Sequence, residues 1–135
     1  MTLTHERFHT PEAAIDCLRR AATTLSEAIL TEDPAERYAL AHVSALRATA
    51  AVLAARARPT GRAARQRNAW LLLRHVAPEF AEWADFFAAG AAKRAAAEAG
   101  ARNAVTAREA EDLIRDADHF LAAVENSFGL TNRVA

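Results

Sequence analysis

The chain has 135 residues, with 17 basic and 17 acidic side chains, so its formal net charge at pH 7 is zero. Hydrophobic residues make up 52% of the sequence, but 37 residues are alanine, which permits close helix contacts and leaves little bulk for a β core. A chain of this length favours one domain that buries about two-thirds of its unfolded surface, and four glycines and four prolines argue against extensive disorder.

Residues 1–9 are expected to form a loosely held arm, and Thr10-Pro11-Glu12 predicts the start of a first helix. Apolar residues then recur at helical spacing and fade near Thr31. They predict an inner face formed by Ala14, Leu18, Ala21, Leu25, Ala28 and Ile29.

A second, longer helix is predicted from Asp33 to Arg58, with Asp33 as N-cap and Pro34 at the first helical position. One apolar stripe comprises Tyr38, His42, Ala45, Thr49, Val52 and Leu53, and a second comprises Leu40, Val43, Leu46 and Ala50. The Thr49 hydroxyl is able to bond back to the Ala45 carbonyl, so the residue need not oppose burial. Because apolar residues cover so much of its circumference, this helix is predicted to be central.

A third helix is predicted from Ala63 to Val76, with Trp70, Leu71, Leu73 and Val76 as its apolar residues. Pro78 predicts a break before a fourth helix over residues 79–100. The aromatic residues of this fourth helix are expected in the core, except that one of the adjacent Phe86 and Phe87 is free to face a partner.

Thr106 and Glu109 form the sequence signature of a capping box, which predicts the start of a fifth helix. Glu111 and Arg115 are expected to pair on its outer side, and Gly129 is expected to end it. Its apolar stripe comprises Ala110, Leu113, Ala117, Phe120, Leu121, Val124 and Phe128. We therefore predict an all-α, five-helix up-and-down bundle over residues 10–129, followed by a frayed tail at 130–135.

Several classes of site are excluded or disfavoured by residue type. The single cysteine, Cys17, cannot form a disulfide framework or a thiolate metal site within one chain, and it is expected to be a small buried side chain. Asp116 and His119 have a metal-like spacing, but the further ligands of a carboxylate–histidine metal site are absent. With no signal core in the N-terminal MTLTHERFHT and no transmembrane run, we expect a cytoplasmic protein without metal, cofactor or membrane contact.

At residues 37–59 the sequence RYALAHVSALRATAAVLAARARP resembles the signature helix of the HEPN superfamily. The following RNAWLLLRHVAPEFAEWADFFAAGAAKRAAAEAG and the closing AVTAREAEDLIRDADHFLAAVE resemble a small actinobacterial branch of HEPN-domain proteins. The resemblance extends over residues 10–128. It implies a compact bundle of four or five helices that often forms a homodimer.

Many HEPN proteins are metal-independent endoribonucleases whose Arg-x4-6-His motif is assembled across a dimer, whereas others lack the motif and serve as binding modules. The matching spacing here is Arg37-x4-His42, in the second helix, although the family's motif usually belongs to a later helix. A later pair, Arg67 and His75, is separated by seven residues.

Two functions remain open. In an endoribonuclease, His42 would act as the acid/base and Arg37 would bind phosphate. At about 100° per residue these side chains lie roughly 140° apart on one helix, so a dimer partner would have to complete the site. His42 also fits an interior histidine that is hydrogen-bonded among Tyr38, Ala45 and Thr49. We therefore prefer a non-catalytic module that acts through protein or nucleic-acid contacts.

Two surfaces are candidates for such contacts. Residues 37–78 hold eight arginines and no acid, and RNA or an acidic protein would be attracted to the cluster of Arg56, Arg58, Arg62, Arg65 and Arg67. No aromatic residues interleave with these arginines, so the cluster also fits a solvated basic edge. Trp83 and Phe86 are expected to contact a second copy of the chain in a homodimer.

Overall fold

The computed structural model describes residues 10–56, 68–101 and 103–130. Over these ranges it contains six α-helices, one 3-10 turn and no strand, which confirms the all-α prediction but not the count of five helices. The predicted arm at 1–9 and tail residues 131–135 lie outside the described residues. The elements are α2 (Glu12–Leu30), α3 (Pro34–Arg56), α5 (Ala69–Val76), η1 (Pro78–Phe80), α6 (Ala81–Ala89), α7 (Ala91–Glu98) and α8 (Ala107–Ser127).

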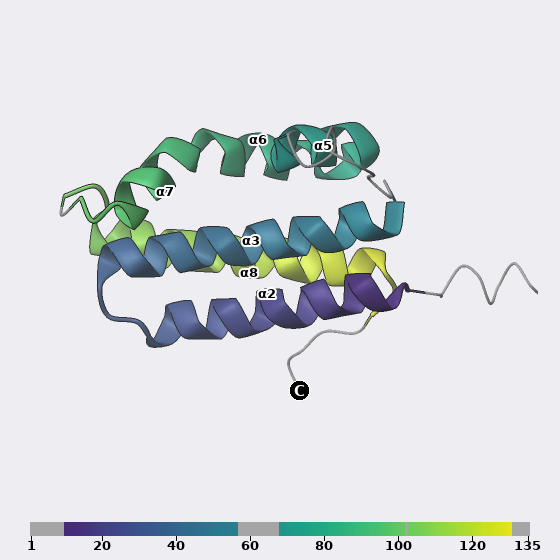
Figure 1. Cartoon of the computed structure of the whole chain (residues 1–135), viewed down its shortest axis with the longest axis horizontal. Coiled ribbons are helices and arrows are strands. Elements are labelled where there is room, and N and C mark those ends of the chain that lie inside the picture. The colour runs from purple at the N-terminus through teal and green to yellow at the C-terminus, as the bar shows by residue number, and fades with distance from the viewer. Residues whose placement is uncertain (1–9, 57–67, 102, 131–135) are drawn as a thin grey trace, which may run out of the picture.

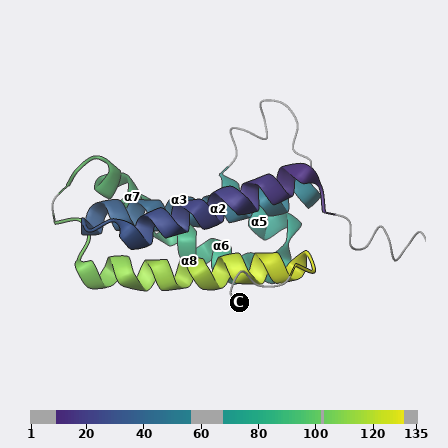
Figure 2. The same cartoon turned by 90° about the horizontal axis from the view of Figure 1, so that it is seen from below.

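The long helices α2, α3 and α8 run along the bundle, and the shorter elements α5 to α7 form its remaining side (Figures 1 and 2). The chain runs along α2, back along α3, returns through α6 and α7, and reverses again into α8 (Figure 1). Helix α3 contacts α2, α5, α7 and α8, so it is the central helix that the sequence predicts.

Helix α3 begins where its cap predicts, because Asp33 Oδ2 accepts a hydrogen bond from the Glu36 backbone N–H at 3.0 Å. Ser44 Oγ donates to the Ala21 carbonyl of α2 at 2.7 Å, which satisfies a buried hydroxyl. Thr49 Oγ1 is buried without a hydrogen-bond partner among the described residues, so the bond to the Ala45 carbonyl that the sequence allows is not formed. The buried residues of α3 are Tyr38, Ala41, His42, Ser44, Ala45, Ala48, Thr49, Ala51, Val52 and Leu53.

Among the described residues, α3 alone is long and apolar enough to cross a membrane. Most of its apolar segment is buried against the other helices, as in the core helix of a soluble protein. Its hydropathy is therefore explained by its central position in the bundle.

The predicted fourth helix is divided into η1, α6 and α7, which is the main difference from the sequence-based expectation. The break between α6 and α7 occurs at Gly90. A Cβ atom at Gly90 would lie 2.8 Å from Tyr38 Oη, so an alanine here would collide with the side chain of α3. The position therefore favours glycine, which also weakens helix continuity.

Helix α8 begins at the predicted capping box, with Thr106 Oγ1 accepting from the Glu109 backbone N–H and Glu109 Oε1 accepting from the Thr106 backbone N–H. The predicted pair of Glu111 with Arg115 is wrong, because Arg115 binds Asp112 Oδ1 at 2.7 Å instead. Gly129 has a φ of 77°, which fits its predicted role at the helix end.

Two apolar residues of the predicted helices are exposed, one on the predicted inner face of the first helix and one among the apolar residues of the third. Ile29 retains 54% of its surface and Leu71 retains 62%, because neither is covered by a neighbouring described element. The rest of the α2 stripe is buried as predicted, and so are Trp70 and Leu73 of α5. Helix α5 begins at Ala69, and the predicted start of the third helix at Ala63 lies outside the described residues.

Candidate functional site

His42 is completely buried beneath α5 and α6. Its ring meets Trp70 and Phe87 edge-on, with ring centroids 5.7 and 5.8 Å away. Nε2 lies 2.9 Å from the Phe87 carbonyl oxygen, which can only accept a hydrogen bond, so Nε2 carries the proton. Burial lowers the pKa of His42 below its ordinary value of 6.5. The neutral ring therefore leaves Nδ1 as an acceptor, and Nδ1 has no partner among the described residues.

The Phe87 carbonyl is available because the helix ends just beyond it. In a continuous helix it would accept from the backbone N–H four residues later, but α6 ends at Ala89. The carbonyl instead accepts from the Gly90 N–H at 3.0 Å and from His42. The break at Gly90 thus supplies the acceptor for the Nε2 proton of the buried His42.

Arg37, the predicted phosphate-binding partner of His42, lies against a different part of the fold. Its Nε donates to the Ala28 carbonyl at the end of α2 at 3.2 Å. That carbonyl belongs to the last turn of α2 and also accepts from the Thr31 backbone N–H at 3.2 Å, so the guanidinium is its second partner at the helix end. The structure therefore directs Arg37 toward α2 and His42 toward α5 and α6.

A pocket of about 260 Å³ adjoins His42. Its lining is mainly apolar but includes the hydroxyl-bearing Tyr38 and the ammonium-bearing Lys93, which is the only lysine in the sequence. Sequence reasoning missed this pocket, because α3, α6, α7 and α8 all contribute to it and no local motif marks it. The lining residues are Tyr38, His42, Phe86, Phe87, Ala89, Gly90, Lys93 and Leu113.

The predicted arginine cluster is described only at Arg56, because Arg58, Arg62, Arg65 and Arg67 lie outside the described residues. Arg56 forms an ion pair with Glu79 at 2.6 Å, and its guanidinium lies 6.0 Å from the centre of the Phe80 ring. It thus joins the end of α3 to the turn that precedes α6.

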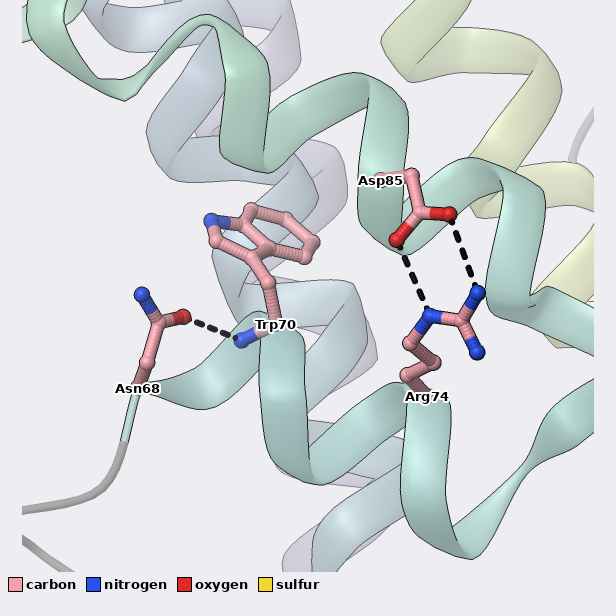
Figure 3. Close-up of polar contacts among 4 residues, drawn as sticks. All are labelled: Asn68, Trp70, Arg74 and Asp85. Carbon is pink, nitrogen blue, oxygen red and sulfur yellow. Dashed lines mark hydrogen bonds and ion pairs between the residues drawn. The ribbon is translucent and has the colours of Figure 1, made fainter.

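The later arginine–histidine pair is also only partly described, because Arg67 lies outside the described residues. His75 is exposed in the last turn of α5. Asn68 Oδ1 caps this helix by accepting from the Trp70 backbone N–H at 2.8 Å (Figure 3). On the outer side, Arg74 makes two contacts with the Asp85 carboxylate, which link α5 to α6 (Figure 3).

The two predicted dimer-contact residues differ in exposure. Phe86 retains 46% of its surface, whereas Trp83 is half-buried. The Trp83 ring stacks on Phe87 with centroids 5.9 Å apart and lies 5.5 Å from Phe120. Phe86 therefore offers more surface to a partner, and Trp83 packs mainly against the core.

Over the described ranges, no group of three or more histidine, cysteine, aspartate or glutamate side chains is arranged to hold a metal ion. Burial raises the pKa of Asp116, which belongs to the metal-like sequence pair with His119. Burial likewise raises the pKa of the partly buried Cys17, which disfavours the nucleophilic thiolate form.

No match was found among curated proteins or among solved structures. The model of the SAV_6107-like HEPN family matches residues 28–125, which is more than half of the 135-residue chain. This region extends from the end of α2 into α8 and includes the helix whose sequence carries the resemblance. The chain therefore belongs to the SAV_6107-like HEPN family.

Proposed function

We propose that this HEPN domain is a non-catalytic module that acts by contact with a partner. The burial of His42 carries the proposal. A general acid/base must reach the proton it transfers, but this ring has no exposed surface and its Nε2 is bonded to the Phe87 carbonyl. The lowered pKa further disfavours the protonated form that would serve as an acid.

The placement of Arg37 supports the same function. A phosphate-binding arginine has to present N–H groups to the substrate, and the Nε of Arg37 is held at the end of α2. An endoribonuclease built on this pair would have to expose the His42 ring and turn the guanidinium of Arg37 away from α2. A contact module needs no such rearrangement.

We propose that one partner is a second copy of the chain, which contacts the exposed surface around Phe86. Aromatic residues are enriched at the centres of protein interfaces, and Phe86 is 46% exposed beside the ordered rings of Trp83 and Phe87. The arginine cluster is proposed as a second contact region, suited to RNA or an acidic protein, because residues 37–78 hold eight arginines and no acidic side chain.

The catalytic question is tested by incubating the full chain with single-stranded RNA in EDTA. We expect intact RNA with the wild type, His42→Ala and Arg37→Ala. Cleavage by the wild type that disappears in both folded variants would overturn the proposal in favour of a metal-independent endoribonuclease. Circular dichroism of each variant establishes that it remains folded.

The assembly is tested by light scattering at tens of micromolar chain, a concentration at which a dimer with a Kd of about 1–10 μM is detected. We expect a dimer for the wild type and a larger monomer fraction for Phe86→Ser. Ile29→Ser is the matched control, because it removes a similarly exposed apolar side chain from α2. A monomeric wild type, or equal effects of the two substitutions, would contradict the proposed surface.

A further inference from the structure

The segment from α5 to α7 is attached to the rest of the bundle largely through side chains. Helices α5 and α7 approach α3, but the main backbone neighbours of α6 are α5, η1 and α7. Large rings attach this part of the chain to α8 instead, because Phe80, Trp83 and Phe87 all meet the ring of Phe120. Separating the segment from the long helices would therefore leave the backbone hydrogen bonds within each helix intact.

Two ion pairs join the segment to the long helices at the surface. Arg56 of α3 pairs with Glu79 of η1, and Lys93 of α7 pairs with Glu109 of α8. The side chains of both pairs are partly exposed, so each pair contributes little to the attachment. The hydrogen bonds from Arg56 and Lys93 lower the pKa of Glu79 and of Glu109, so both pairs stay ionised at pH 5.

The polar contact between α3 and α6 inside the core is the bond from His42 Nε2 to the Phe87 carbonyl, at 2.9 Å. Protonation of the ring would add an N–H group at Nδ1, which is buried and has no acceptor among the described residues. The ring has no exposed surface and meets Trp70 and Phe87 edge-on. The closed arrangement therefore leaves the second proton of an imidazolium without a partner in apolar surroundings.

The charged groups around the imidazole do not offset this cost. Arg94 and Glu98 of α7 act on the ring with opposite signs and pair with each other at 3.0 Å. Arg74 of α5 and Asp85 of α6 form a pair on the outer side of the segment (Figure 3). The pair that joins α7 to α8 is likewise neutral overall. On α3 itself, burial raises the pKa of Tyr38, so this neighbour stays uncharged.

We propose that protonation of His42 releases the segment from α5 to α7 from α3 as one unit, while α2, α3 and α8 stay packed together. The pair of Arg74 with Asp85 holds α5 to α6 during the opening, and the bond of Ser44 to the Ala21 carbonyl still joins α3 to α2. In the open state the imidazole meets water, and its pKa returns toward 6.5. The open state thus binds more protons than the closed state, so it gains population as the pH falls. This device belongs to the fold itself and requires no partner.

The test is native-state hydrogen exchange of the full chain in low concentrations of urea, followed by NMR. The amides of Ala77 and Gly90 report on the segment, because they bond to carbonyls within it, and those of Ala48 and Leu121 report on α3 and α8. We expect opening constants about tenfold or more larger at Ala77 and Gly90, with a weaker urea dependence because less surface is exposed. Below about pH 6.5 these constants should rise about tenfold per pH unit.

Two variants assign the pH dependence to one ring. His42→Gln keeps a donor for the Phe87 carbonyl but cannot take up a proton, so its opening constants should stay the same from pH 7.5 to 5. His75→Gln is the matched control, because it removes an exposed histidine from α5 and should retain the pH dependence.

The wild type alone is sufficient to overturn the proposal, even if His42→Gln fails to fold. Equal opening constants and equal urea dependence at the four reporting amides would mean that the chain opens only as a whole. Opening constants at Ala77 and Gly90 that do not change with pH would exclude the histidine as the trigger. A pH dependence that persists in folded His42→Gln, or disappears in His75→Gln, would also overturn it.

Discussion

Helix α3 and the segment from α5 to α7 build the same core in opposite ways. Helix α3 is continuous and contributes small side chains, with Ala41, Ala45, Ala48 and Ala51 all completely buried. The segment from α5 to α7 is broken several times and contributes large rings, including Trp70, Phe80 and Phe87. The small alanine side chains of α3 let neighbouring helices approach it closely. The large rings of the segment from α5 to α7 fill the rest of the core.

This difference predicts that the two regions respond to opposite changes in side-chain volume. Removing a ring from α6 should leave a cavity, whereas adding volume to α3 should force its neighbours apart. The following substitutions test the contrast, from the largest expected effect to the smallest.

Phe87→Ala should lower the free energy of unfolding by about 3–5 kcal/mol, measured by urea denaturation. Phe87 is 1% exposed and contacts the rings of His42, Trp70, Trp83 and Phe120. Phe86→Ala is the matched control and should cost much less, because that ring is half exposed. Similar losses in the two variants would show that α6 is not anchored through Phe87.

Ala48→Leu should destabilise the fold by about 1–3 kcal/mol because α3 has no space for the added methyl groups. Ala50→Leu is the comparison, since Ala50 is only partly buried. The same denaturation measurement applies to both. If Ala48→Leu were neutral or stabilising, the neighbouring helices would not be packed closely against α3 at this position.

Acid should weaken the contact between the two regions through His42. Its pKa is lowered in the folded state, so the unfolded chain binds more protons and stability falls as pH drops below about 6.5. Each unit of pKa difference corresponds to about 1.4 kcal/mol. We expect His42→Gln, measured across pH 7.5 to 5, to reduce this pH dependence. If the free energy of unfolding of His42→Gln changed with pH as much as that of the wild type, other groups would be responsible for the pH dependence.

Gly90→Ala should cost about 1 kcal/mol, because the new Cβ would meet Tyr38 Oη at 2.8 Å. Tyr38→Phe in the same chain removes that oxygen and should recover much of the loss in a double-mutant cycle. Additive effects of the two substitutions would mean that the helix break does not depend on this contact.

The positions of α3 and α8 could be predicted from sequence because their signals are local. Asp33 and Thr106 cap the helices, and continuous apolar periodicity follows each cap. The contact between Gly90 and Tyr38 at the break could not be predicted, because the two residues are distant along the chain. Periodicity also placed Ile29 on the inner face of the first helix, but its burial depends on whether another element covers it.

The candidate site shows the same division. The apolar stripe of α3 allowed His42 to be interpreted as an interior histidine, which agrees with its burial. The predicted neighbours of His42 all lie in α3, whereas the acceptor of its hydrogen bond is the Phe87 carbonyl of α6. That acceptor exists only because α6 ends at Ala89, so tertiary structure determines it.

The short connection between α2 and α3 has a consequence for the order of folding. Residues 31–33 alone separate the two helices, and the Ser44–Ala21 and Arg37–Ala28 hydrogen bonds join them. Closing this local hairpin costs less chain entropy than bringing α8 against α3. The α2–α3 pair is therefore expected to form first and to provide the surface onto which α8 later docks. In the finished fold α2 and α8 both contact α3.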